Sequence, residues 1–325
     1  MAIKFSGLKS IKGQVKVKNK NSGNNSIIQN PNVYSGSNDN TVKKIDSSGN
    51  EVWTFTGHTQ RVNAIAVDAS GNVYSGSGNF PIVKSTKVKK IDSSGNELWT
   101  FSGHTQRVIA IAVDASGNVY SGSFDTTVKK IDSSGNLIWT FTGHSNWVYS
   151  VAVDSSGNVY SGSQDATVRK IDSSGNEIWT FTGHTSRVFS VAVDASGNVY
   201  SASEDNTVKK IDSSGNELWT FTGHTDRVLS VAVDSSGNVY SGSQDNTVKK
   251  IDSSGNIVWT FNVGSSRVSG VNVDQLGNVY AGLVENQEVI KLDSNGNKIW
   301  TFTGHTGTVW VPPAVDPGLY PIFWS

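Results

Sequence analysis

The chain repeats one block of about forty residues almost unchanged. IDSSGNELWTFTGHTDRVLSVAVDSSGNVYSGSQDNTVKK runs from Ile211 to Lys250, and IDSSGN begins again at Ile251. The tripeptide Asn-Val-Tyr occurs seven times along the chain, beginning at Asn32, Asn72, Asn118, Asn158, Asn198, Asn238 and Asn278. A fixed period of this length is typical of architectures in which copies of one small unit stack against one another.

Each unit is expected to form four short β-strands. In the copy above these are ELWTFTG, RVLSVAV, NVYSGS and NTVKKI, which are rich in the β-branched and aromatic residues that favour strands. Two Asp-x-Ser-Gly-Asn segments per unit predict tight turns, because Asp bonds its own turn and Gly accepts a positive φ. One such sheet cannot bury both faces alone, but radially placed copies cover one another. The sequence therefore predicts an all-β fold, a seven-bladed β-propeller of four-stranded antiparallel blades.

The charge balance gives no sign of a nucleic-acid or membrane partner. The chain has 27 Lys+Arg and 27 Asp+Glu, so no overall field attracts it to either. It has no cysteine, which excludes disulfides and thiolate metal sites. The start, MAIKFSGLKSIKGQVKVKNK, lacks the apolar stretch of a signal peptide, and no long apolar run follows. We expect no nucleic-acid partner, no membrane insertion, and a protein that is cytoplasmic, exported without a signal peptide, or virion-associated.

Gly-His pairs precede the first strand of most units. They begin at Gly57, Gly103, Gly143, Gly183, Gly223 and Gly304. Together with S-x-D-x-T-V-K-K and a terminal aliphatic-Asp pair, this pattern resembles the WD-repeat family over residues 32–311. The resemblance implies that each His hydrogen-bonds an Asp in the turn between the second and third strands. The implied pairs are His104 with Asp125, His144 with Asp165, His184 with Asp205, and His224 with Asp245.

The sequence departs from the family pattern in three ways. Ile211-Asp212 and its counterparts stand where the family has Trp-Asp, so the network should stop at the His-Asp pair or at a serine. An insertion within GNFPIVKST removes the Asp of the second unit and leaves His58 without that partner. Val263-Gly264 replaces Gly-His in the last full unit, where Glu285 is near the Asp position.

The two ends of the chain complement each other. His305 has no Asp turn after it, while the turn of Asp39 has no Gly-His before it. We therefore expect these two residues to pair, with TVWV (308–311) as the inner strand of a blade otherwise formed by residues 32–55. The alternative is that SII (26–28) closes that blade. The predicted divisions are a basic extension (1–31), the propeller (32–311) and a C-terminal tail (312–325).

We expect no catalytic site, metal or cofactor. His-Asp pairs in a serine-rich chain resemble parts of a hydrolytic triad, but a catalytic set is normally single and these pairs recur. The turn Asp residues would suit calcium, but each turn offers one carboxylate and the turn itself explains it. Paired lysines such as Lys43 and Lys44 are expected to lie along the sheet, with a basic rim as the alternative. Packing between blades is expected of Trp53, Trp99, Trp139, Trp179, Trp219, Trp259 and Trp300.

Comparison of the units within this chain separates constant from variable positions. The variable ones lie before and within the first strand and around the turn Asp, and a propeller places both regions on one face. A basic position recurs beside them, and arginines and aromatics are enriched at binding hot spots. The predicted binding face consists of Arg61, Arg107, Phe124, Trp147, Tyr149, Gln164, Arg187, Phe189, Glu204, Arg227, Gln244 and Arg267. Drift of surface loops is the alternative explanation.

The leading hypothesis is a non-enzymatic scaffold that binds a protein partner on this variable face. The first alternative is a multivalent carbohydrate-binding propeller, because near-identical blades would offer one shallow pocket several times. The second is a structural component of a larger assembly such as a virion or phage tail, with the apolar end near Phe323 and Trp324 as an anchor.

Overall fold

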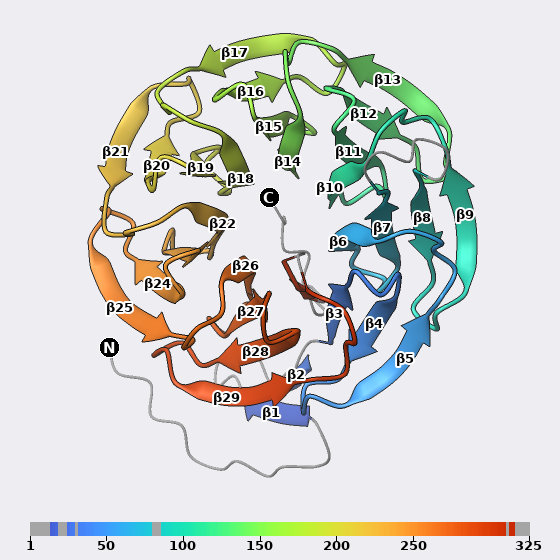
Figure 1. Ribbon diagram of the computed structural model, residues 1–325, viewed down its shortest axis with the longest axis vertical. Coiled ribbons are helices and arrows are strands. Elements are labelled where there is room, and N and C mark those ends of the chain that lie inside the picture. Colours follow the sequence, from blue (N-terminus) through green and yellow to red (C-terminus); the bar gives the residue numbers. More distant parts are fainter. Residues whose placement is uncertain (1–13, 19–24, 30–31, 80–85, 310–311, 316–325) are drawn as a thin grey trace.

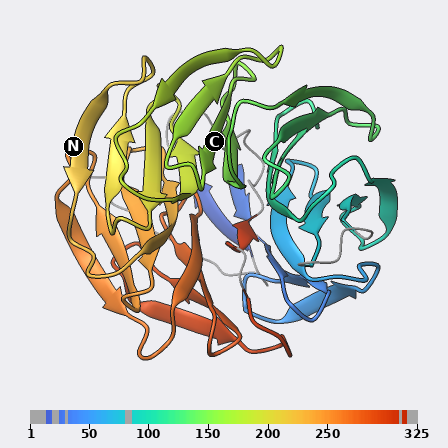
Figure 2. The ribbon, with the colours of Figure 1, turned by 45° about the horizontal axis from the view of Figure 1, so that its top comes forward.

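The computed structural model describes residues 14–18, 25–29, 32–79, 86–309 and 312–315. These residues form seven four-stranded antiparallel sheets arranged radially around one axis, together with one two-stranded hairpin (Figure 1). The tilted view in Figure 2 shows the same blades placed side by side around that axis. The predicted all-β, seven-bladed propeller is confirmed. In the part of the chain described here, no helix is long and apolar enough to cross a membrane.

Every blade has the same order from the axis to the rim. The innermost strands are β6 (Val62–Val67), β10 (Val108–Val113), β14 (Val148–Val153), β18 (Val188–Val193), β22 (Val228–Val233), β26 (Val268–Val273) and β30 (Ala314–Val315). The second strands are β7 (Val73–Ser77), β11 (Val119–Ser123), β15 (Val159–Ser163), β19 (Val199–Ser203), β23 (Val239–Ser243), β27 (Val279–Leu283) and β3 (Val33–Gly36). The third strands are β8 (Val88–Ile91), β12 (Val128–Ile131), β16 (Val168–Ile171), β20 (Val208–Ile211), β24 (Thr247–Ile251), β28 (Glu288–Leu292) and β4 (Val42–Ile45). The outer strands are β9 (Glu97–Phe101), β13 (Leu137–Phe141), β17 (Glu177–Phe181), β21 (Glu217–Phe221), β25 (Ile257–Asn262), β29 (Lys298–Phe302) and β5 (Glu51–Phe55).

The constant turns are held by their own aspartates. Between β12 and β13, Asp132 Oδ1 accepts the backbone N–H groups of Ser134 (2.9 Å) and Asn136 (2.8 Å). Gly135 takes φ 94°, a left-handed conformation that favours glycine. A Cβ on Gly135 would also lie 3.2 Å from the ring of Trp99 in the preceding blade. Each turn therefore reverses the chain and receives the indole of its neighbour.

The hydrophobic core lies between blades rather than inside one. Tyr120 and Val128 of one blade share a buried cluster with Val148, Val159 and Ile171 of the next. All five are fully buried. Complete burial of a valine or isoleucine stabilises the fold by roughly 1.5–3 kcal/mol. The repeated apolar positions therefore stabilise the ring only when neighbouring copies are present.

The outer-strand tryptophans connect consecutive blades around the ring. Each indole Nε1–H donates to a serine carbonyl in the next blade's outer turn. The pairs are Trp53 to Ser93, Trp99 to Ser133, Trp139 to Ser173, Trp179 to Ser213, Trp219 to Ser253, Trp259 to Ser294 and Trp300 to Ser47, at 3.0–3.2 Å. Each ring also contacts the buried second-strand tyrosine of its own blade, as Trp139 does at 6.1 Å from Tyr120. These tryptophans occupy the places predicted for them, and the last pair joins the seventh blade to the first.

Both ends of the chain contribute to the first blade, but the pairing strand differs from the prediction. The sheet order is β30-β3-β4-β5, with Val33 opposite Val315 and Tyr34 opposite Ala314. The paired residues therefore follow TVWV (308–311) instead of lying within it, and residues 310–311 are outside the described part. The propeller reaches Val315, so the predicted boundary at residue 311 is too early.

The alternative closure is wrong. Residues 26–28 belong to β2 (Asn25–Gln29), which pairs with β1 (Gln14–Lys18) and not with β3. The remaining predicted extension and the tail with Phe323 and Trp324 lie outside the described residues.

Candidate functional site

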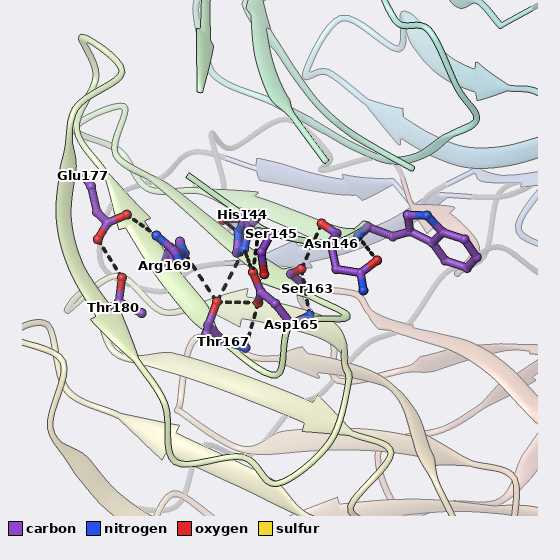
Figure 3. A network of polar contacts seen from close by, with 11 residues as sticks. His144, Ser145, Asn146, Ser163, Asp165, Thr167, Arg169, Glu177 and Thr180 are labelled. Atoms are coloured by element: carbon purple, nitrogen blue, oxygen red, sulfur yellow. Dashed lines mark hydrogen bonds and ion pairs between the residues drawn. The ribbon is translucent and has the colours of Figure 1, made fainter. Parts of the chain in front are cut away.

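The Gly-His loop and the turn between the second and third strands meet in one polar network (Figure 3). His144, between β13 and β14, places Nδ1 2.8 Å from Asp165 Oδ2. Its Nε2 lies 2.7 Å from Ser161 Oγ. Asp165 Oδ1 also accepts the Thr167 hydroxyl at 2.6 Å. Burial opposes ionisation of Asp165, but hydrogen bonds from His144 and Thr167 outweigh it and hold the pKa of the carboxyl well below its usual range. The carboxylate therefore fixes the loop.

The same network recurs around the ring. The distances from His Nδ1 to Asp Oδ2 are 2.8 Å for His104 and Asp125, 2.8 Å for His184 and Asp205, 2.7 Å for His224 and Asp245, and 3.3 Å for His305 and Asp39. In the blade of Figure 3, Ser161 is fully buried and His144 is 3% exposed. A catalytic nucleophile and its base must be able to reach a substrate, and the buried hydroxyl of Ser161 is not accessible to one. The repeated arrangement instead satisfies the hydrogen-bonding needs of buried polar groups.

Two blades depart from the network as the sequence indicates. His58 keeps the serine contact, 2.7 Å from Ser75 Oγ, but its buried Nδ1 has no hydrogen-bond partner among the described residues. In the seventh blade, Glu285 accepts the backbone N–H of Arg267 at 2.7 Å and its side-chain Nε–H at 2.6 Å. Glu285 therefore holds that loop without a histidine.

His58, which lacks the Asp partner, is expected to make the free energy of unfolding sensitive to acid. Burial, and then the charge of Lys89, lowers the pKa of His58 from 6.5 to about 4. The unfolded chain takes up this proton below about pH 6.5 and the folded chain only near pH 4, so stability falls as pH drops through that window. The loss should be about 2–3 kcal/mol. Urea unfolding of wild type and His58→Gln between pH 7 and 4 measures this loss. The free energy of unfolding of the variant should decrease less as the pH falls. An equal slope in both proteins would contradict the assignment.

The turn aspartates have little capacity left for a cation. Both oxygens of Asp132 already accept hydrogen bonds, with Oδ2 3.0 Å from the side-chain nitrogen of Asn136. Within the described ranges, no group of three or more His, Asp or Glu residues is placed to hold a metal ion. The geometry of these turns therefore follows from hydrogen bonding within the turn itself.

The paired lysines do not form a free basic rim. Lys43 is largely buried and donates to Glu51 (2.8 Å) and Thr54 (2.9 Å). Lys44 lies 5.6 Å from the ring centroid of Tyr34 and donates to the carbonyl of Ser93 at 3.2 Å. Their charges are engaged along the sheets, as the leading interpretation of the sequence expected.

Four aromatic residues of the predicted face gather at one place. The rings of Phe124 and Trp147 stack at 3.9 Å with an interplanar angle of 7°. Tyr149 contacts Phe124 edge-on at 5.9 Å and Phe189 at 5.2 Å. We call Phe124, Trp147, Tyr149 and Phe189 the aromatic cluster. It spans three consecutive blades, because each ring meets a residue of its neighbour.

The aromatic cluster adjoins a central, partly open cavity of about 420 Å³ that is lined by the inner strands. Phe124, Tyr149, Phe189 and Arg107 are the members of the predicted face that line it. Arg107 places its guanidinium 4.9 Å from the Phe124 ring centroid, a cation–π arrangement. Burial raises the pKa of Tyr149, and the charges of Arg187 and Arg107 oppose that rise. A mostly apolar hollow with a few convergent polar groups is the usual form of a binding site.

Most of the other predicted face residues have polar contacts in the structure. Arg187 and Arg227 each lie 3.3 Å from Glu204. Gln164 accepts the hydroxyl of Tyr149 at 3.1 Å, and the backbone N–H of Gln244 donates to the carbonyl of Arg227 at 2.9 Å. Arg267 pairs with Glu285, whereas Arg61 is exposed. The face therefore differs from blade to blade, with its aromatic character limited to one sector.

The sequence interpretation did not include several cavity residues in the binding face. Asn63, Ile109 and Leu229 line the cavity with Tyr149, because all occupy the second position of an inner strand. These positions vary between units, which could have indicated a binding surface. Because alternate residues of a strand point to the same side, the shared second position would have placed these side chains on the same side of their strands. The serines at the third position of some inner strands also went unnoticed: Ser190 Oγ in β18 accepts the N–H of Val231 in the next blade at 3.2 Å.

Two family models match the chain. The family described as outer membrane protein assembly factor BamB matches residues 124–237 and 204–315. The family described as IP5P C-F beta-propeller matches residues 8–170. No curated protein matches the chain. Both matching families consist of β-propeller domains, in agreement with the seven blades.

Proposed function

Because this chain belongs to the β-propeller family, we propose that it is a non-enzymatic scaffold that binds a protein partner at the aromatic cluster and the cavity mouth. The observation that supports this most directly is the stack of Phe124 and Trp147 beside a 420 Å³ cavity, with Arg107 against the same ring. Tryptophan, tyrosine and arginine supply a large share of the energy at protein interfaces. The cluster therefore has the composition of a hot spot.

The surrounding ring supports this role because neighbouring blades are packed and hydrogen-bonded to one another. Inner strands, buried tyrosines and inter-blade tryptophans hold the cluster before any partner arrives. Binding to a preorganised surface costs less conformational entropy than binding to a mobile one. The recurring His–Asp–Ser sets support the finer inference that the repeats are of the WD type, with isoleucine in place of the family's tryptophan.

Among the described residues, the concentration of aromatic rings at one blade junction favours a protein partner over a repeated glycan site. Multivalent carbohydrate binding would use the same pocket in several blades. Here the residue stacked on the neighbouring blade is Trp147 at one junction, while Arg227 pairs with Glu204 at another. The blades therefore present different surfaces at the positions where a shared sugar pocket would lie.

The proposal predicts that Trp147→Ala weakens partner binding without unfolding the ring. A random dodecapeptide phage library panned against wild type should yield binders, and Trp147→Ala should weaken them about thirtyfold, because truncating a hot-spot tryptophan costs about 2 kcal/mol. Fluorescence anisotropy with the selected peptides measures this loss. Gln244→Ala, a polar change on the same face, should leave the affinity within about threefold.

Three outcomes would contradict the proposal. The first is that Trp147→Ala binds the selected peptides as tightly as wild type does. The second is that panning against wild type selects no peptide. The third is that the protein binds glycans on an array and selects no peptide. Thermal unfolding of both variants distinguishes a lost contact from a lost fold.

A further inference from the structure

One blade junction contains a carboxylate between two arginines. Glu204 lies just after β19, and its carboxylate contacts Arg187 of the same blade and Arg227 of the next, both at 3.3 Å. The backbone N–H of Glu204 donates to the carbonyl of Arg187 at 2.9 Å, which fixes its position beside the loop. At this position of the repeat, one carboxylate forms ion pairs with the guanidinium groups of two neighbouring blades.

The corresponding place in the second blade has no side chain. Gly78 follows β7 as Glu204 follows β19, and its N–H donates to the carbonyl of Arg61 at 3.2 Å. Arg61 and Arg107 thus correspond to Arg187 and Arg227. A Cβ on Gly78 would lie 2.9 Å from Arg107 Cα, and the residue takes φ 151°. Backbone contact therefore favours glycine here, and position 78 supplies no carboxylate.

Arg107 is consequently a half-buried cation that has no counter-ion among the described residues. Its Nη2–H donates to Asn63 Oδ1 at 3.0 Å, and its buried Nε has no hydrogen-bond partner among the described residues. No ion pair joins Arg61 or Arg107 to a carboxylate in the described part of the chain. Burial lowers the pKa of Arg107, and the charge of Arg61 lowers it further. An incoming anion would relieve both effects, because an unpaired charge is costly to remove from water.

We propose that Arg61 and Arg107 bind the carboxylate of an acidic side chain in the protein partner. The carboxylate would take the place that Glu204 fills three blades further along. An adjacent apolar side chain of the partner would enter the cavity against Phe124 and Tyr149, since Arg107 lies on that same wall. The inference rests on the proposed scaffold function and adds the chemistry of its ligand.

The test uses a matched pair of small probes, 4-fluorophenylacetate and its neutral analogue 4-fluorophenylacetamide. Fluorine NMR titration of wild type should show the acid binding at least about tenfold more tightly than the amide, because charge-assisted hydrogen bonds to a carboxylate are the stronger kind. Arg107→Gln should remove this preference. Arg267→Gln, which removes an arginine already paired with Glu285, should retain it.

A second variant tests the equivalence of the two junctions. Glu204→Ala leaves Arg187 and Arg227 without their carboxylate and should raise the number of bound acid molecules from one to two. Equal affinity for acid and amide, an acid preference that survives Arg107→Gln, or no added site in Glu204→Ala would each overturn the inference.

The peptide selection separates this inference from the scaffold function. Selected peptides that need Trp147 but carry no Asp or Glu would overturn the carboxylate site and support the scaffold. Acid-selective probe binding without any selected peptide would support the site and overturn protein binding. Enrichment of an acidic residue next to an apolar one would support both.

Discussion

Replacing His184 by alanine is expected to lower the free energy of unfolding by about 4 kcal/mol. The imidazole connects Asp205, 2.8 Å from Nδ1, with Ser201, 2.7 Å from Nε2, and it is 4% exposed. Its removal leaves a fully buried hydroxyl and a largely buried carboxylate without their shared partner. Breaking a buried charged contact from one side is costly, because the remaining group stays desolvated.

The chain provides its own matched control in His58. This residue lacks the Asp partner, so His58→Ala removes the serine contact and the ring packing alone and should cost about 2 kcal/mol. Urea unfolding of the two variants at pH 7 gives the difference. Equal losses would show that the His–Asp contact adds nothing to stability. Loss of a measured activity from His184→Ala at unchanged stability would overturn the non-enzymatic proposal.

Replacing Gly270 by serine is expected to destabilise the protein by at least about 3 kcal/mol, because it opposes the closure of the ring. Gly270 lies in β26, where the inner strands of the three preceding blades carry Ser150, Ser190 and Ser230. A Cβ at Gly270 would lie 2.3 Å from the backbone Cα of Pro312. Backbone cannot move aside as a flexible side chain can, so the segment leading to β30 would shift away from β3.

Ala110→Ser provides the control for this substitution. It introduces serine at the same strand position in β10. Ala110 is buried, but Ser150 at this position in β14 accepts the N–H of Val191 in the next blade at 3.0 Å, so a serine hydroxyl has a partner of that kind here and the change should cost no more than about 1 kcal/mol. Thermal and urea unfolding of both variants measure the contrast. Equal stability of the two would mean that Pro312 does not pack against β26 in solution.

Much of the fold could be predicted because each repeat unit contains the residues that define its strands, turns and internal contacts. Strand number, turn positions and the His–Asp spacing all lie within one unit, as with His144 and Asp165, which are 21 residues apart. The pairing of His305 with Asp39 was also predictable, because each end lacked what the other had. Complementary gaps in a repeat indicate closure without any knowledge of coordinates.

The closing strand could not be placed by the same argument. The repeat pattern ends near Val309. The residues that pair with β3 are Ala314 and Val315, and they come directly after Pro312 and Pro313. Proline has no N–H to donate to a ladder, so the template strand is interrupted there. Sequence periodicity does not show how the backbone resumes pairing after such an interruption.

The sequence by itself determined the seven four-stranded units and the partners inside each, because those contacts are local and repeat with the period. Only the tertiary structure decided which side chains of different blades meet. The stack of Phe124 on Trp147, the glycine at position 78 beside Arg107, and the cavity lined by Tyr149 all arise at junctions between copies. Radial packing sets these contacts through the distance and rotation between sheets, which a one-dimensional pattern does not contain.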